Sequence, residues 1–416
     1  MSVRLGMSSA VRVGGPAAPR SSGAKSTRSA LVCHSFCADS ALIPTKSNVA
    51  SSGNRCLTSL DFVMIHPSFP AGVRPPLFPL EAVGGAVSLQ SPFYVERAVD
   101  QELKDEISKG EGVILIKGAR QIGKTSLLAR GLEYARQTGK GVVLTDFQKL
   151  NTADLKDLPS FYRALATSLA AQLDLDEDLT DHWDDRLSPN RNFERFVKEA
   201  VLGDRQQPLV WAMDEADRLI VSSLASEVFS LMRAWYNERA LDVQGPWSKL
   251  QWIVSYATEG HLFITDLNLS PFNVGKKLDI QDLTRAQVAD LNDRYGSPLK
   301  SEVDLDAFYD WVGGQPYLVR RSLHELVLNP SLWAKFGEAA GRSDGIFSDH
   351  LKRIVLLLSK NRPLLEALRR VLDGGAQPDE HQLHCLQSGG VMVPGRGGEM
   401  RLRNRLYEGY FSRHLG

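Results

Sequence analysis

The sequence predicts an α/β fold, in which helices flank a parallel sheet, followed by a mainly helical C-terminal part. Two observations lead to this expectation. Short apolar runs alternate with helical patterns between about residues 112 and 256, and helical patterns dominate after residue 283. A chain of 416 residues has room for two or three structured units at ordinary domain sizes.

Residues 1–78 are expected to form a disordered tail. They are rich in Ser, Ala, Gly and Arg, have no acidic residue before Asp39, and show no sustained period of two or 3.6. Residues 1–60 resemble an organelle transit peptide in this respect. A gene start placed too far upstream, with the true initiator at Met64, explains the same composition. We favour this second explanation, and with it a cytoplasmic protein.

The overall composition excludes several classes of protein. The chain has 49 basic and 49 acidic residues, so its net charge gives no reason to expect nucleic-acid binding. No run approaches the roughly 20 apolar residues that a membrane-spanning helix needs. Of the four cysteines only Cys385 lies in a region expected to fold, which argues against a disulfide framework.

The α/β domain is expected over residues 79–280. Its strands are expected where the chain is apolar, at residues 112–116, 141–146, 208–213 and 250–256. Its helices are expected at residues 94–103, 124–136, 158–173, 193–202 and 225–238. The strand at 208–213 is almost continuously apolar, as strands buried on both faces of a sheet are.

Two further units are expected in the C-terminal part. A helical lid should occupy residues 281–345, with helices at 285–294, 305–312 and 316–328. A winged helix-turn-helix should occupy residues 346–416, with helices at 350–359, 363–372 and 380–387. A β-hairpin should follow at residues 390–402, where two turn-forming pairs, Pro394-Gly395 and Gly397-Gly398, lie near its middle.

Residues 118–125 match the pattern of a glycine, four residues, and then Gly-Lys-Thr, directly after a predicted strand and at the start of a predicted helix. Glycines let the backbone approach phosphates closely, and the helix N-terminus attracts negative charge. Lys124 should reach the β- and γ-phosphates, and the Thr125 hydroxyl should coordinate Mg²⁺. The sequence thus predicts binding of a nucleoside triphosphate, with ATP favoured. The contacting residues are expected to be Gly118, Ala119, Arg120, Gln121, Ile122, Gly123, Lys124, Thr125 and Ser126.

The strand at 208–213 is followed by two acidic residues. Asp214 is expected to hold Mg²⁺, and Glu215 to orient or deprotonate the attacking water. An acidic cap of the next helix is the alternative reading, but the nearby loop favours hydrolysis. Asp217 is expected to be a capping or surface charge. The sequence therefore predicts a slow ATPase with Lys124 and Glu215 as its catalytic residues.

In ATPases with an additional strand in the sheet, a polar residue at the end of one strand senses the γ-phosphate. The end of the strand at 250–256 is the corresponding position here. Ser255 or Thr258 is placed to do this. A hydroxyl at a strand end is common, however, and an ordinary structural role is slightly favoured for each residue taken singly. Arg120 is expected to be a cation that faces solvent or lies near the phosphates. No transition-state role is assigned to it, because arginine fingers usually come from elsewhere.

With these residues in view, residues 80–415 resemble the AAA-like ATPases of the STAND class, the signal-transduction ATPases with numerous domains. The resemblance is carried by Tyr94-Val-Glu-Arg97 with Asp100 and Leu103, Gly118-Ala-Arg-Gln-Ile-Gly-Lys-Thr-Ser-Leu127, Asp214-Glu-Ala-Asp217, Gly313-Gly-Gln-Pro-Tyr-Leu-Val319, and Arg403-Asn-Arg-Leu-Tyr407 before Tyr410-Phe411.

The resemblance implies that Tyr94, Val95 and Arg97 lie near the adenine and that Pro316 touches the nucleotide from the lid. Two departures stand out. The class usually has Gly-Arg-Glu where this chain has Glu96-Arg97. It also usually carries a long repeat array that senses a ligand, whereas this chain ends at Gly416, directly after the predicted winged helix.

The class implies a function as a switch, in which the nucleotide state biases a closed form against an open form that assembles with itself or with protein partners. One alternative is a DNA-binding ATPase of the initiator or transposition type, whose wing would contact DNA phosphates through its arginines. Arginines grouped at a hairpin more often form a face exposed to solvent. The arginines of the predicted wing are Arg396, Arg401, Arg403 and Arg405. Another alternative is a scaffold that holds nucleotide without turnover.

Overall fold

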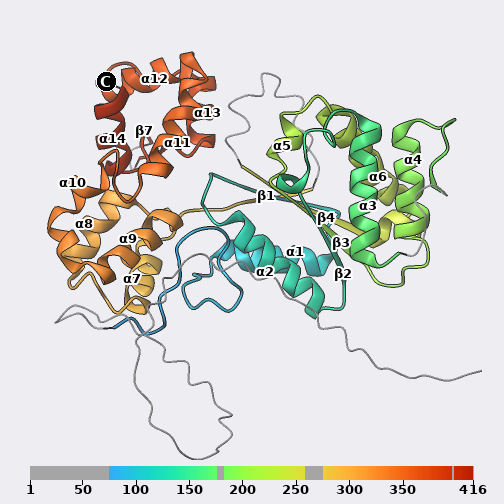
Figure 1. Ribbon diagram of the computed structural model, residues 1–416, viewed down its shortest axis with the longest axis horizontal. Coiled ribbons are helices and arrows are strands. Elements are labelled where there is room, and N and C mark those ends of the chain that lie inside the picture. Colours follow the sequence, from blue (N-terminus) through green and yellow to red (C-terminus); the bar gives the residue numbers. More distant parts are fainter. Residues whose placement is uncertain (1–74, 176–181, 258–274, 396–397, 416) are drawn as a thin grey trace, which may run out of the picture. The chain divides into compact units, whose positions relative to one another are not determined.

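A computed structural model describes residues 75–175, 182–257, 275–395 and 398–415 (Figure 1). The expected disordered tail lies outside the described residues, except for its last four positions. Thr258 and Arg396 also lie outside them. Within the described residues, no helix is long and apolar enough to cross a membrane.

Five parallel strands form the central sheet, in the order β2-β3-β4-β1-β5. Their bounds are β1 Val113–Gly118, β2 Gly141–Asp146, β3 Leu209–Asp214, β4 Leu250–Ala257 and β5 Lys276–Asp279. Strands β3 and β4 are buried along their whole length, which explains the apolar run of β3 before Asp214. The parallel α/β fold is confirmed. The edge strand β5 was not predicted, because only Leu278 among its four residues is buried.

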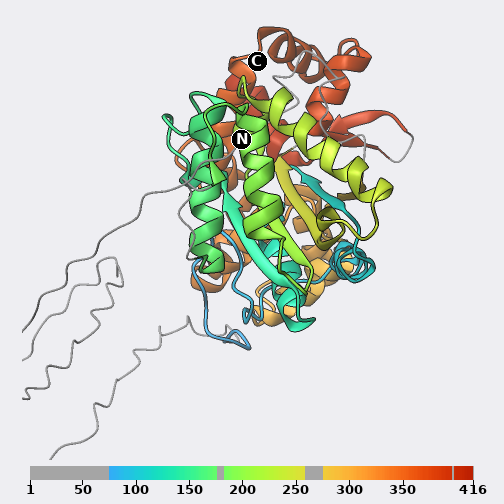
Figure 2. The same cartoon turned by 90° about the vertical axis from the view of Figure 1, so that its right-hand side faces the viewer.

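Helices cover both faces of this sheet. Strand residues alternate between the faces, so Ile114 and Ile116 pack against α1 (Ala98–Lys109) and α2 (Lys124–Gln137). Val113 and Leu115 join the opposite cluster, which includes residues of α3 (Leu158–Leu173), α4 (Pro189–Phe196) and α6 (Ala225–Leu241). Figure 2 shows α3 and α6, in green and yellow-green, in front of the strands.

Two local differences from the predicted helices lie on the side of the sheet covered by α3. The helix expected at residues 193–202 is split: α4 ends at Phe196 and a π-helical turn, Val197–Val201, completes it. A four-residue helix, α5 (Asp217–Ile220), begins two positions after Glu215. This helix begins before the one predicted at residues 225–238, and Asp217 is its first residue.

The part after β5 is mainly helical, as expected. Its helices are α7 Arg285–Arg294, α8 Glu302–Val312, α9 Pro316–Leu328, α10 Phe336–Ala340, α11 Ser348–Ser359, α12 Arg362–Leu372, α13 Glu380–Ser388 and α14 Arg405–Leu415. The hairpin pairs β6 (Met392–Pro394) with β7 (Met400–Leu402) in antiparallel register. The helix α14 after the hairpin was not predicted.

One hydrophobic cluster runs through these C-terminal helices. It includes Leu291 of α7, Phe308 of α8, Leu323 of α9, Leu351 of α11 and Phe411 of α14. We call α11 to α14, together with the hairpin, the C-terminal segment. Because this segment and α7 to α10 share a core, its position relative to the preceding helices is fixed by packing as well as by polar contacts.

Candidate functional site

The loop of residues 118–125 connects β1 directly to α2, as the motif requires. Gly123 has a φ of 102°, a left-handed conformation that glycine adopts without a Cβ clash. No side chain caps the N-terminus of α2, so its first N–H groups remain available to a ligand. The buried Lys124 turns back over the loop, and its Nζ donates to the carbonyl oxygens of Gly118 and Ala119, at 3.2 Å each.

The acidic pair after β3 meets this loop. The Thr125 hydroxyl donates to Oδ2 of Asp214 at 2.8 Å, across 89 positions of sequence. Oδ1 of Asp214 accepts the backbone N–H of Glu215 at 3.0 Å. A hydroxyl and a carboxylate in contact are suitable oxygen ligands for Mg²⁺, which needs few protein ligands because it retains waters. The donor set present therefore fits a magnesium nucleotide.

A cavity of about 430 Å³ opens over the loop and the acidic pair, within the usual size range of ligand pockets. The loop contributes Arg120, Gln121, Gly123, Lys124, Thr125 and Ser126 to its lining. Strand ends and the turn after β2 contribute Asp146, Gln148, Asp214 and Glu215. The remaining lining comes from residues 83–87 and from Pro316, Tyr317, Arg320 and Arg353. The loop thus lies at one wall of a cavity built from six separate parts of the chain.

Residues 83–87 form a strap along one side of the cavity. The N–H of Val87 donates to Oγ of Ser126 at 2.9 Å, and Arg130 of α2 donates to the carbonyl oxygens of Val87 and Ser88. This strap was not predicted. The glycine pair Gly84-Gly85, ahead of the phosphate-binding loop, is the sequence signal that could have indicated it.

Tyr94, Val95 and Arg97, which the family resemblance places near the adenine, do not line the cavity. The hydroxyl of Tyr94 donates to Asp100, and Val95 is buried in the core shared with the C-terminal helices. Arg97 donates to the carbonyl oxygens of Ile122 and Gln281, at 2.9 and 3.3 Å. Arg97 therefore holds the loop from outside the cavity. Burial, together with the adjacent Asp100 carboxylate, raises the pKa of Tyr94, which keeps its hydroxyl a donor.

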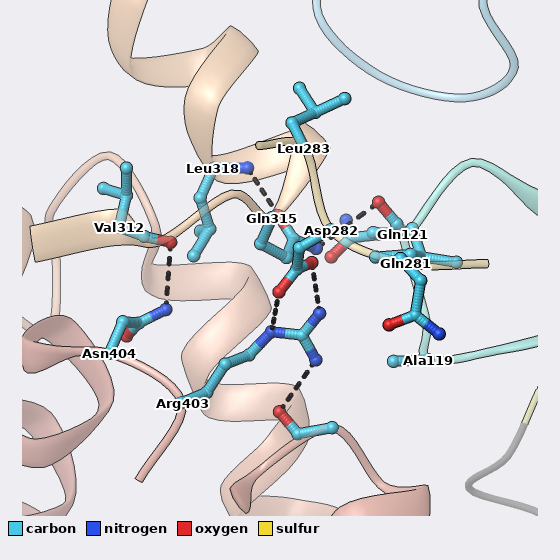
Figure 3. Close-up of polar contacts among 12 residues, drawn as sticks. Ala119, Gln121, Gln281, Asp282, Leu283, Val312, Gln315, Leu318, Arg403 and Asn404 are labelled. Atoms are coloured by element: carbon cyan, nitrogen blue, oxygen red, sulfur yellow. Dashed lines mark hydrogen bonds and ion pairs between the residues drawn. The ribbon is translucent and has the colours of Figure 1, made fainter. Parts of the chain in front are cut away.

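Pro316 does line the cavity, at the first position of α9. Beside it, the buried Gln315 donates from Nε2 to the carbonyl oxygens of Gln121, at 3.3 Å, and Arg120, at 3.5 Å (Figure 3). Gly314 is required here, because a Cβ at that position would lie 1.8 Å from the carbonyl oxygen of Leu283. The Gly-Gln-Pro turn is therefore a contact between the loop and α9 as well as a helix start.

Ser255 and Asp217 both lie near the end of β4. Ser255 is fully buried opposite Ile116, and it does not line the cavity. Asp217 is not simply a capping or surface charge, because its Oδ1 accepts the backbone N–H of Ala257 at 2.7 Å. Asp217 thus ties the turn after β3 to the end of β4. No sequence pattern distinguishes this bond from a helix cap.

His350 of α11 reaches the same loop, and sequence reasoning missed it. Nε2 of His350 pairs with the Tyr407 hydroxyl at 2.7 Å, and Nδ1 with Oε1 of Gln121. Because Oε1 only accepts, neutral His350 donates from Nδ1 and accepts the Tyr407 proton at Nε2. Burial, assisted by the cations Arg403 and Arg353, lowers the pKa of His350 to about 3. A histidine in an apolar helical pattern gave no sign of this partner.

This pKa predicts a stability change with pH. The folded chain binds the His350 proton less readily than the unfolded chain, whose histidine has the ordinary pKa of 6.5. The stability that depends on neutral His350 is therefore complete above pH 6.5 and is lost as the pH falls towards 3. Between pH 7.5 and 5 this loss is expected to be about 2 kcal/mol. Urea unfolding at both pH values should show that loss in the parent and a smaller one in His350→Gln; equal losses would contradict the prediction.

The arginines of the hairpin region were expected to form a solvated face, and this is wrong for Arg403. Its side chain is 9% exposed and is ion-paired with Asp282, with Nε to Oδ2 at 3.1 Å. It also donates to the carbonyl oxygen of Gly390 at 3.1 Å. Arg405 pairs with Asp310 at 3.1 Å and lies over the Trp311 ring.

Comparisons with known proteins give a family match and a curated relative. Residues 82–413 match the model of a family described as AAA-like domain. An uncharacterized WD repeat-containing protein of Synechocystis sp. is 29% identical over 254 residues, which are 58% of this chain and 20% of the relative. The chain thus spans about a fifth of the length of that curated relative.

Among solved structures, a Walker-type ATPase of Pyrococcus abyssi has a TM-score of 0.51 and 16% identity, covering 75% of this chain and 94% of its own. This likeness concerns the fold. A STAND protein of Pyrococcus horikoshii with a tetratricopeptide repeat sensor gives a TM-score of 0.40 at 15% identity, covering 79% of this chain and 44% of its own.

Proposed function

Since the chain belongs to the AAA-like domain family, we propose that it binds ATP with Mg²⁺ and hydrolyses it slowly, as a nucleotide-controlled conformational switch. The observation that carries this proposal is the bond between Thr125 and Asp214, because it joins the two halves expected of a magnesium nucleotide site. The cavity above that bond is also of a suitable size and presents basic side chains to an anionic ligand.

Each residue of the site has a proposed role. Lys124 and the open N–H groups of α2 bind the phosphates, and Thr125 with Asp214 holds the metal. Bound magnesium ATP supplies the phosphoanhydride bond that is cleaved. Glu215 lines the cavity next to Asp214 and orients the water or accepts its proton. The chemistry asked of the protein is positioning and charge stabilisation, which these groups provide.

The switch is proposed because C-terminal elements contact the site. We propose that α7 to α10 form the lid of residues 281–345, and that α11 to α13 with the hairpin form a winged helix within residues 346–416. Gln315 and His350 join both units to the loop through Gln121. A change in the loop that accompanies nucleotide exchange therefore alters contacts with both units. By this argument the STAND class is the best description of the chain, with assembly of copies or protein partners as its output.

The test of the switch uses the purified full chain with ATP, ADP and GTP. We expect ATP and ADP to bind more tightly than GTP, slow release of phosphate from ATP, and loss of that turnover when EDTA removes Mg²⁺. Limited proteolysis should cut the ADP and ATP forms at different rates. Turnover that persists in EDTA argues against the metal site, and identical proteolysis of the two forms argues against the switch.

DNA binding is not favoured. In the part of the hairpin region that the structure describes, Arg403 and Arg405 are paired with acidic residues of the chain itself, and only Arg401 projects as an exposed arginine without an acidic partner. A groove-binding wing needs several cations free to neutralise phosphates. Salt-sensitive retardation of duplex DNA by the full chain, lost in Arg401→Ala, would restore this alternative.

A further inference from the structure

The turn after β2 lies in the wall of the proposed nucleotide site. It is a short 3₁₀ turn, Phe147–Lys149, and Asp146 precedes it at the end of β2. Strand β2 pairs with β3 in a register that sets Asp146 beside Asp214. Because the two strands are parallel, the segments that follow them leave the sheet at the same edge. Asp146 and Gln148 accordingly line the cavity together with Glu215.

Arg218, the second residue of α5, fixes the backbone of this turn. Its Nη1 donates to the carbonyl oxygens of Phe147 at 2.8 Å, Leu150 at 2.7 Å and Gln148 at 3.3 Å. On the other side of the turn, Oδ1 of Asp146 accepts the backbone N–H of Gln148 at 2.9 Å. The backbone of Gln148 is thus held both at its N–H and at its C=O.

Helix α5 also connects this turn to the rest of the sheet edge. Asp217, directly before Arg218, accepts the backbone N–H of Ala257 at the end of β4. Glu215 lies two positions before α5, with its φ of 53° in the left-handed region. The turn after β2 and the turn after β3 are therefore joined by hydrogen bonds. The backbones of Gln148 and Glu215 are held in a fixed relation at one wall of the cavity.

The side-chain amide of Gln148 is available to a ligand. It forms no hydrogen bond with any residue of the described ranges, although the backbone N–H and C=O of Gln148 both do. The residue is exposed and lines the cavity. An amide has donors as well as an acceptor, so it can bond a phosphate oxygen and a water molecule together. Since it is neutral, it approaches a triphosphate without the charge repulsion that the neighbouring carboxylates of Asp146 and Glu215 bring.

We propose that the Gln148 amide hydrogen-bonds the terminal phosphate of ATP and its attacking water, and that Arg218 is the residue that positions it. The inference rests on the proposed hydrolysis and deepens it, because it names a further catalytic residue. In that reaction the water oxygen forms a bond to the outermost phosphorus. The bond from this phosphorus to the bridging oxygen breaks, and ADP leaves with the electron pair. Glu215 takes the water proton, and Gln148 exchanges none; its bonds orient the water and stabilise the phosphate charge in the transition state.

The test measures steady-state phosphate release by the full chain with Mg²⁺ and ATP, and the affinities of ADP and a non-hydrolysable ATP analogue by calorimetry. In Gln148→Ala we expect kcat to fall about tenfold or more, because a hydrogen bond made in the transition state is lost. KM and both affinities should change less than about twofold. The matched control is Lys149→Ala, the exposed neighbour that does not line the cavity, and it should behave as the parent.

Arg218→Ala tests the positioning role. Loss of the bonds that hold the turn should lower kcat by a similar factor, and Arg218→Lys should recover part of it, since an ammonium keeps the charge at the carbonyl oxygens. In the double variant with Gln148→Ala, kcat should fall little below that of Gln148→Ala alone, because Arg218 acts through the missing amide. The control for the lost charge is Arg233→Ala on α6, an exposed arginine that does not line the cavity.

The ratio of turnover to affinity separates this proposal from a structural role, since ADP affinity reports whether the site remains folded. Unchanged turnover in Gln148→Ala, or equal weakening of turnover and of both affinities, overturns the inference and leaves the proposed ATPase intact. Fully additive losses in the double variant overturn the positioning by Arg218. A parent chain that binds ATP without turnover overturns the proposed hydrolysis and the inference together.

Discussion

Lys124→Ala is expected to lose ATP binding by about 100- to 1000-fold, because two charge-assisted contacts to phosphate disappear together. Lys124 is 6% exposed, and its ammonium is already held at 3.2 Å from two loop carbonyl oxygens. Its position is therefore fixed before the nucleotide arrives, and little side-chain entropy is lost on binding. Calorimetric titration with Mg²⁺ and a non-hydrolysable ATP analogue measures this effect.

The control for Lys124→Ala is Lys109→Ala. Lys109 is at the end of α1, its side chain is 66% exposed, and its partner is Glu106. Removing it subtracts the same charge from the protein without touching the cavity, so binding should stay within about twofold of the parent. Thermal unfolding of both variants checks that the fold persists. If Lys124→Ala bound the analogue as tightly as the parent, the loop would not be the phosphate site.

The loop and the acidic pair were predictable because each is local in the sequence. A glycine-rich turn followed by Lys124 and Thr125 needs only the strand before it and the helix after it. An apolar run that ends in Asp214 marks a strand buried on both faces. Strands β1 and β3 end at the same edge of a parallel sheet. This brings Thr125, after β1, and Asp214, at the end of β3, together even though β4 lies between the two strands.

The rest of the site was not predictable, because its residues act through distant partners. His350 lies 229 positions from Gln121, and nothing within its own helix indicates that bond. Arg403 appeared to belong to a basic wing, since its partner Asp282 lies 121 positions earlier. The edge strand β5 carries one buried residue and so lacks an apolar pattern. Hydrophobic periodicity indicates which side of a helix or strand is buried. It does not identify the distant residues that contact that side.

Glu215→Gln is expected to retain ATP binding and to lose turnover by about 100-fold or more, because an amide cannot accept the proton of the attacking water. Glu215 has a φ of 53°, in the left-handed region, and this turn directs the residue to the cavity after β3. Glutamine keeps the size of the side chain and brings no new backbone preference. The change therefore removes the base and leaves the backbone of the turn as it is.

Steady-state phosphate release and ATP titration must be measured on the same preparations of this variant. The control is Glu227→Gln on α6, an exposed glutamate that does not line the cavity, which should keep both turnover and affinity near those of the parent. A fall in turnover with unchanged affinity locates the loss in the chemical step, since a binding defect raises KM instead. Equal turnover in Glu215→Gln and the parent would remove Glu215 from the chemistry. If both rates were near zero with ATP still bound, the chain would be a nucleotide-locked scaffold, and the switch would be governed by nucleotide exchange alone.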